Sequence, residues 1–178
     1  MVTSIPAMLG YVPTDHIALI GLTPVQDGPD GRHEVGPVVT IDIDENTTIS
    51  SAKATASLMS AKEQGAPVPD EWIAVVIASQ DDHRADGIHV VTELLPLALH
   101  IGDAVHLSDY TPGTTIYDVS EEVKAGTIGD YRTNPLTVMV AARGDVIFSD
   151  QQSWYEAGGP RLRAESLRRQ IKADQADE

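Results

Sequence analysis

Two uninterrupted apolar segments constrain the fold of this chain more than any other feature. They are residues 16–22, His-Ile-Ala-Leu-Ile-Gly-Leu, and residues 72–78, Trp-Ile-Ala-Val-Val-Ile-Ala. Apolar runs of this length are typical of buried β-strands. Segments with the 3.6-residue spacing of helices alternate with them, so the sequence predicts an α/β fold.

The remaining signals predict a mixed, about five-stranded sheet with helices packed against it. Further strands are expected at residues 38–43, 104–107 and 114–119, the first of them paired with 16–22 as an antiparallel hairpin across a loop at 23–36. Helices are expected at residues 5–11, 49–64, 84–101 and 136–142 and around Trp154. Asn46, Thr47 or Thr48 should cap the second of these, Asn134 the fourth, and Ser149 or Asp150 the last. Pro96 should kink or divide the helix at 84–101, because proline cannot donate a backbone hydrogen bond.

The chain has 178 residues, so we expect a single domain at residues 1–158, followed by a charged helix at 159–178. Ala164, Leu167 and Ile171 form a thin apolar stripe on that helix. The stripe leaves three interpretations open: docking onto the domain, pairing with a second subunit, or fraying into solvent.

The formal net charge is −15, and it is unevenly distributed. Residues 1–160 hold 23 acidic and 7 basic side chains, whereas residues 161–178 hold 4 and 5. A body this acidic repels phosphate backbones, so we expect no direct nucleic-acid binding. The same charge favours a basic protein partner, or imitates DNA toward a DNA-binding protein. The plainer interpretation is solubility alone.

Other absences narrow the chemistry. The chain has no cysteine, which rules out disulfides, thiolate catalysis and Cys-ligated metals. It shows neither a signal peptide nor an apolar stretch of about 20 residues, so we expect a cytoplasmic protein without a membrane span. The glycine motifs of nucleotide-binding loops and the nucleophile elbow are missing too, and residues 126–129 are interpreted as a loop. No cofactor is predicted apart from a divalent metal.

That metal would bind at the run Ser79-Gln80-Asp81-Asp82-His83, which follows the strand at 72–78. Open α/β sheets place ligands at the carboxyl ends of strands, so this run is the main candidate site. Asp81, Asp82 and His83 are candidate metal ligands, and His100 and His106 would join them if their elements are neighbours. Ser79, Asp82 and His83 are the candidate catalytic residues.

The alternative interpretation of this run is a solvated loop in which Asp81 or Asp82 caps the next helix. Adjacent residues on one loop rarely converge on one ion, and Ser79 has no assignable base. Asp15 and His16 form another candidate acid–base pair, but neighbouring side chains of a strand point to opposite faces. We therefore interpret Asp15 and His16 as structural.

Several phrases resemble one known family. Residues 8–15, Met-Leu-Gly-Tyr-Val-Pro-Thr-Asp, and the apolar strand after them look like the opening of the actinobacterial family called domain of unknown function 4192. The strand at 38–43 and residues 134–149 are similar to later parts of that family. His16 and Asp150 depart from its pattern, which commonly has Ser and Arg there. The resemblance implies the fold and an actinobacterial setting, or a compact version carried by a bacteriophage, but no catalytic residue.

Three functional hypotheses follow for this acidic protein. The favoured one is a protein-binding module, phage-encoded and acting on a host factor. The second is a metal-assisted hydrolase that uses Asp81, Asp82 and His83. The third is a homo-oligomeric structural component in which residues 160–178 pair between subunits.

Overall fold

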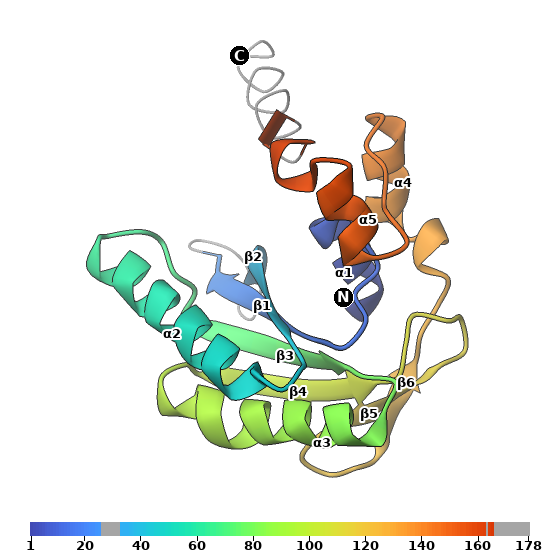
Figure 1. The fold of residues 1–178 in the computed structure, drawn as a ribbon. Helices are drawn as coiled ribbons and strands as arrows, with labels where there is room; N and C mark the ends of the chain where they lie inside the picture. The colour runs from blue at the N-terminus through green and yellow to red at the C-terminus, as the bar shows by residue number, and fades with distance from the viewer. Residues whose placement is uncertain (26–32, 163, 166–178) are drawn as a thin grey trace. The chain divides into compact units, whose positions relative to one another are not determined.

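The computed structural model describes residues 1–25, 33–162, 164 and 165. The chain divides into two compact units (Figure 1). One unit spans Thr14–Gly129, and the other joins Met1–Pro13 to Asp130–Glu178. We call them the sheet unit and the helical unit. The predicted boundary at residue 158 stays a prediction.

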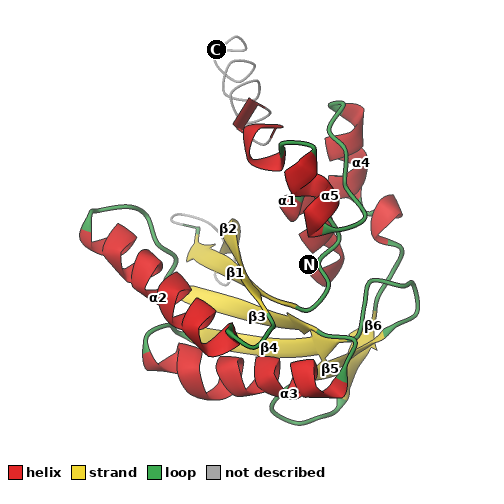
Figure 2. Ribbon diagram, viewed as in Figure 1, coloured by secondary structure: helices red, strands yellow, loops and turns green. Residues whose placement is uncertain are grey.

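The sheet unit contains one mixed six-stranded sheet in the order β2-β1-β3-β4-β5-β6 (Figure 2). The strands are β1 (His16–Pro24), β2 (His33–Asp42), β3 (Glu71–Ile77), β4 (Ile101–Leu107), β5 (Thr115–Asp118) and β6 (Lys124–Thr127). Strands β3 and β4 are parallel, and the other neighbouring pairs are antiparallel. The predicted α/β class, the mixed sheet and the β1–β2 hairpin are confirmed.

Helices α2 (Thr47–Glu63) and α3 (Asp81–His89) lie along the same face of this sheet (Figure 1). The core beneath them is built from alternate residues of the strands and from the apolar residues that follow α3: Ile17, Leu19, Ile41, Ile43, Trp72, Ala74, Val76, Val90, Val91 and Leu95. The residues that alternate with these on β1 and β3, such as Ile20 and Val75, are also fully buried. The two long apolar runs are therefore buried on both faces, as their sequence predicts.

Two expectations were wrong at the outer strands of the sheet, β2 and β6. Strand β2 begins at His33 and not at 38. Its first residues were missed because they are mostly exposed and show no alternation of apolar and polar residues. The segment at 126–129 was predicted as a loop, but β6 covers Lys124–Thr127 at the edge of the sheet. That strand has four residues, Lys-Ala-Gly-Thr, and none of them is a large apolar or aromatic residue, so periodicity could not reveal it.

The helix expected at 84–101 begins earlier and ends earlier. Helix α3 starts at Asp81 and passes into a π-helical turn, η2 (Val90–Leu94), and a 3-10 turn, η3 (Leu95–Leu97). Pro96 lies in that last turn, and β4 begins at Ile101. The predicted kink or division at Pro96 is not seen, because the helical segment ends at Leu97 and does not continue to His100 and Ile101.

The helical unit contains η1 (Val2–Ser4), α1 (Ile5–Leu9), η4 (Tyr131–Thr133), α4 (Pro135–Ala142) and α5 (Gln151–Glu156). The Asn134 side chain caps α4 and also donates to the Thr3 hydroxyl at 3.0 Å, which ties the two ends of this unit together. Asp150 caps α5 through the Ser153 N–H at 2.7 Å. The predicted terminal helix at 159–178 falls largely outside the described residues.

Candidate functional site

The candidate site lies beyond the carboxyl end of the central strand β3. Because β1 runs antiparallel to β3, its first residue, His16, pairs with Ile77 at the end of β3. This register brings Asp15, which precedes β1, beside Ser79 and the first turn of α3. Sixty-four positions of sequence separate Asp15 from Ser79, yet the two are in direct contact.

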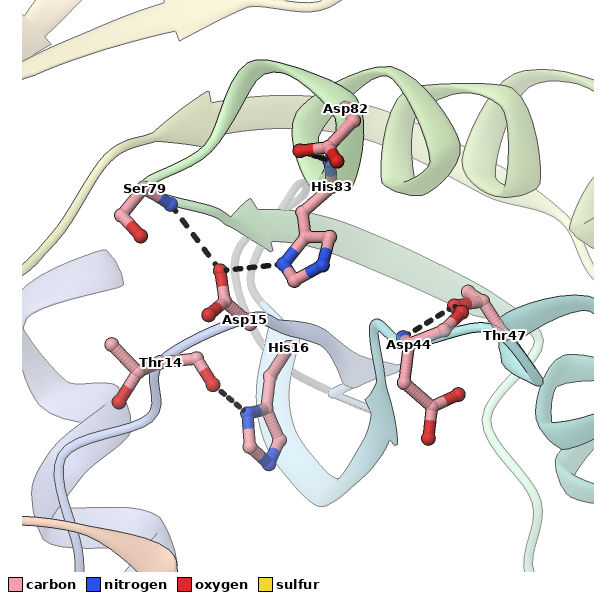
Figure 3. A network of polar contacts seen from close by, with 8 residues as sticks. All are labelled: Thr14, Asp15, His16, Asp44, Thr47, Ser79, Asp82 and His83. Carbon is pink, nitrogen blue, oxygen red and sulfur yellow. Dashed lines mark hydrogen bonds and ion pairs between the residues drawn. The ribbon is translucent and has the colours of Figure 1, made fainter.

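Asp15 connects Ser79 and His83 through one carboxylate oxygen (Figure 3). Its Oδ1 accepts a hydrogen bond from the Ser79 backbone N–H at 3.3 Å and lies 3.3 Å from Nδ1 of His83. Both the Asp15 and the His83 side chains are 28% exposed. The site is therefore partly enclosed and open to solvent on one side.

The backbone holds Asp15 in place. Its φ is +53°, a left-handed conformation that Asp and Asn tolerate better than most residues. Its carbonyl accepts a hydrogen bond from the Ile43 N–H at 2.8 Å, just beyond β2. Asp15 is thus fixed both by the turn into β1 and by the end of the neighbouring strand.

Nδ1 of His83 is a buried atom that makes no hydrogen bond among the described residues, and it faces the Asp15 carboxylate at ion-pair distance. A carboxylate only accepts hydrogen bonds, so Asp15 favours the neutral tautomer with its proton on Nδ1. The other nitrogen, Nε2, then keeps its lone pair, and Figure 3 shows it pointing away from Asp15. The main chain of His83 is held by Asp82, whose Oδ1 accepts the His83 N–H at 2.9 Å. A histidine positioned in this way can accept a proton from a group on its solvent side.

His16 forms a second His–Asp pair that differs in burial. Its Nε2 lies 2.9 Å from Oδ1 of Asp42, and its Nδ1 contacts the Thr14 carbonyl. His16 is only 5% exposed, and Figure 3 shows its ring directed away from His83. Asp15 and His16 therefore take different partners, and the two His–Asp pairs are separate. The geometry gives His16 a structural role at the start of this strand.

The candidates from the Ser79–His83 run fall into separate contacts. Ser79 enters the network through its backbone N–H, and its hydroxyl is turned away from His83 in Figure 3. The Asp81 carboxylate is 89% exposed and pairs with Arg84 at 2.8 Å. Asp82 bonds the next backbone N–H, while Gln80 occupies the cap position of α3. Of this run, Ser79 and His83 are the two that meet at Asp15.

His100 and His106 lie elsewhere in the sheet unit. His100 precedes β4, and its backbone carbonyl accepts a hydrogen bond from the Trp72 N–H. This contact is at the start of β3, the opposite end of that strand from His83. His106, on β4, stacks on Tyr117 with ring centroids 5.1 Å apart. Burial lowers the pKa of His106 below 6.5, and the positive charge of Arg84 lowers it further, while Glu122 opposes the shift. Among the described residues, no three His, Asp or Glu side chains are grouped to hold a metal ion.

The residue that sequence reasoning missed as a partner is Asp15. A single signal could have found it: an antiparallel pairing of the runs 16–22 and 72–78 places the start of one beside the end of the other. That pairing is not specified by either run alone, because both are apolar throughout.

A family model for a domain of unknown function, DUF4192, matches residues 1–178. The chain belongs to this family. The predicted resemblance is thereby confirmed over the whole chain, while the actinobacterial or phage setting stays a prediction. No curated protein and no solved structure matches the chain. In the part of the chain that the structure describes, no helix is both long and apolar enough to cross a membrane.

Proposed function

We propose that the protein is a hydrolase in which His83 acts as a general acid–base catalyst and Asp15 positions it. The observation that carries this proposal is the Asp15 carboxylate oxygen, which lies 3.3 Å from both the Ser79 N–H and Nδ1 of His83. An Asp–His pair of this kind fixes the tautomer and the orientation of the imidazole, and stabilises the imidazolium that forms during proton transfer.

The reaction that suits this arrangement is the hydrolysis of an ester by water. Nε2 of His83 takes a proton from water as the water oxygen bonds to the acyl carbon. The bond from that carbon to the leaving oxygen then breaks, and His83 returns the proton to the leaving alkoxide. General acid–base catalysis of this type contributes about 10²- to 10⁴-fold in rate.

This proposal revises the hydrolase hypothesis drawn from the sequence. That hypothesis combined Asp81, Asp82 and His83 around a divalent metal. Because Asp81 pairs with Arg84 and Asp82 bonds its own helix, neither provides the carboxylate partner of His83. Asp15, from the start of β1, takes that role.

The test compares two histidines of the same helix. His89, the last residue of α3, is exposed, so His89→Gln removes one solvent imidazole without touching Asp15. We expect His83→Gln to reduce hydrolysis of a neutral p-nitrophenyl ester by at least about tenfold, and His89→Gln to leave it nearly unchanged. Equal losses in the two variants would mean that any exposed imidazole accounts for the rate.

Asp15→Asn tests the positioning role separately from folding. Asparagine tolerates the left-handed backbone and can still accept the Ser79 N–H, but it removes the negative charge beside the imidazole. We expect kcat to fall while KM stays constant. A changed KM with constant kcat would assign Asp15 to substrate binding.

A second candidate function, the protein-interaction module, has one specific observation in its favour. The sheet unit, residues 14–129, carries 19 acidic and 5 basic side chains, a net charge of −14, whereas the rest of the chain carries 8 and 7. Charge concentrated on one unit favours a basic partner such as a host protein met by a phage-encoded factor. Titration with an Arg-rich peptide tests it, and binding that is absent at low salt would refute it. Self-association through residues 160–178 stays a prediction, since most of these residues lie outside the described part.

A further inference from the structure

We infer that the exposed side of helix α2 binds a second copy of this chain, with the two α2 helices antiparallel across a twofold axis. This side carries four apolar residues, which we call the α2 stripe: Ile49, Ala52, Ala56 and Met59. The inference is independent of the proposed hydrolase function, because the α2 stripe and the Asp15–His83 site share no residue.

Helix α2 has two sides that differ in what they contact. The side toward the sheet holds Thr47 and Ser51, which are buried, and Ala54 and Leu58, which pack against the core. The members of the α2 stripe follow one another at intervals of three, four and three residues, so they share another side of the helix. At 3.6 residues per turn, the centres of the two sides are about 150° apart. The α2 stripe therefore points away from the sheet.

The α2 stripe is apolar and yet accessible to solvent. Ile49 is 54% exposed and Met59 is 41% exposed, and Ala52 and Ala56 are both exposed. Scattered apolar residues are ordinary on protein surfaces, whereas apolar residues that recur at helical spacing mark the side of a helix that is covered. We therefore expect another surface to pack on the α2 stripe.

Charge distinguishes α2 from the rest of the sheet unit. That unit has a net charge of −14, which repels a second copy. Residues 46–62, however, hold two lysines and no acidic side chain. Lys62 lies 3.4 Å from Asp70, so its charge is already paired. The length of α2 is thus a surface on which two copies of an acidic chain can meet without bringing carboxylates together.

The α2 stripe also matches itself when it is reversed. Its order is large, small, small, large, and its intervals are the same from either end. In an antiparallel pair centred at residue 54, Ile49 of one copy faces Met59 of the second copy, and Ala52 faces Ala56. A twofold interface requires a surface that is complementary to itself in this way. The two alanines let the helix axes approach to about 8 Å, the short end of the range for packed helices.

The size of the contact sets its strength. Helix α2 has 17 residues. It is therefore about 25 Å long and, with its side chains, about 10–12 Å wide, which gives a contact of about 300 Å² per copy. Stable complexes bury about 800 Å² per partner, and weak, transient ones bury less. The dimer should therefore be weak and reversible, and it should form at high protein concentration.

Disulfide crosslinking tests the register, because the full chain has no cysteine of its own. Ala52→Cys and Ala56→Cys are prepared separately, then oxidised alone and as a mixture. A disulfide needs Cα atoms within about 7 Å, and the antiparallel pair brings residue 52 of one copy to residue 56 of the other. We expect at least about threefold more crosslinked dimer in the mixture than in either variant alone.

Sedimentation equilibrium of the full chain tests the surface, with two variants that add the same charge. Ile49→Glu should weaken the dimer at least about tenfold, because it places a carboxylate in the apolar contact. Val146→Glu, at a 64% exposed residue outside α2, should leave it close to native. Raising the salt from about 0.02 to 0.5 M should strengthen the native dimer, because Asp44, Glu45 and Glu63 flank the two ends of α2 and screening reduces their repulsion.

Three results would overturn the inference. A native chain that stays monomeric at about 1 mM in high salt has no such interface, even if the α2 stripe binds a different protein. A dimer that Ile49→Glu and Val146→Glu weaken equally, or that neither weakens, forms through another surface such as residues 160–178. Crosslinking of Ala52→Cys with itself as efficiently as with Ala56→Cys contradicts the antiparallel register.

Discussion

Replacing Gly87 by alanine should destabilise the protein, although alanine is the better helix former. Gly87 is a buried residue of α3, one turn after His83. A β-carbon there would lie 2.6 Å from Cγ1 of Val76 and 3.0 Å from Cδ1 of Ile43, both in the core beneath the helix. Ordinary contacts between carbon atoms are about 3.5–4.0 Å, so α3 or these side chains must shift by several tenths of an ångström or more.

The expected magnitude is the difference of two opposing effects. Alanine gains about 1 kcal/mol of helix propensity over glycine, whereas overpacking a well-packed core costs about 1–3 kcal/mol. The net effect should be a loss of about 1 kcal/mol in the free energy of unfolding, measured by urea denaturation followed by circular dichroism. Ala85→Gly, at an exposed position of the same helix, measures the propensity effect alone.

The result also bears on the site. Because His83 and Gly87 are one turn apart, a shift of α3 away from β3 should lengthen the contact between Asp15 and His83 and lower the ester hydrolysis rate. A Gly87→Ala variant that is more stable than the native chain would refute the reasoning, since it would show that α3 does not depend on close packing at this residue.

Three further outcomes are expected. Asp15→Ala should lower the free energy of unfolding by about 1–2 kcal/mol, because alanine is disfavoured at φ +53°. Asp15→Asn should keep a stability close to that of the native chain. Equal losses of stability in the two variants, measured by urea denaturation, would contradict this. Burial lowers the pKa of His106 below its ordinary value of 6.5, so below pH 6.5 the unfolded chain binds more protons than the folded chain, and the free energy of unfolding falls as the pH drops. His106→Phe should reduce this loss of stability between about pH 7 and 5. An unchanged dependence of the free energy of unfolding on pH would count against the reasoning. Hydrogen bonds, the largest from the Ser153 backbone N–H, lower the pKa of Asp150. The ionised Asp150 carboxylate therefore stabilises the start of α5 above pH 3.8, and this stabilisation is lost as the pH falls further. Asp150→Ala should remove this acid-dependent loss from thermal unfolding curves.

The central strands could be predicted because their sequences carry a strong signal. Residues 16–22 and 72–78 are apolar at nearly every position, and both become strands buried on two faces. Helix ends with specific chemistry were equally clear: Asn134 and Asp150 do cap α4 and α5, and Gly65 and Gly144 adopt positive φ after α2 and α4. Local chemistry therefore predicted local structure.

What failed depends on partners that are distant in sequence. Strand β6 exists because β5 pairs with it, and its own residues carry no apolar alternation. The partner of His83 was missed for the same reason, since the Asp15 contact requires the β1–β3 pairing. Sequence analysis named both His83 and Asp15 as candidates, but it had no means of choosing the strand order that brings the two together.

The protonation of the His83 ring tests the central claim most directly. A long-range ¹H–¹⁵N correlation spectrum of the full chain, assigned with His83→Gln, shows which ring nitrogen carries the proton in the neutral form. The account predicts a proton on Nδ1, facing Asp15, and a bare Nε2, with this preference lost in Asp15→Ala. A proton on Nε2 in the native chain would contradict it, because His83 would then have no lone pair on its solvent side to accept a proton.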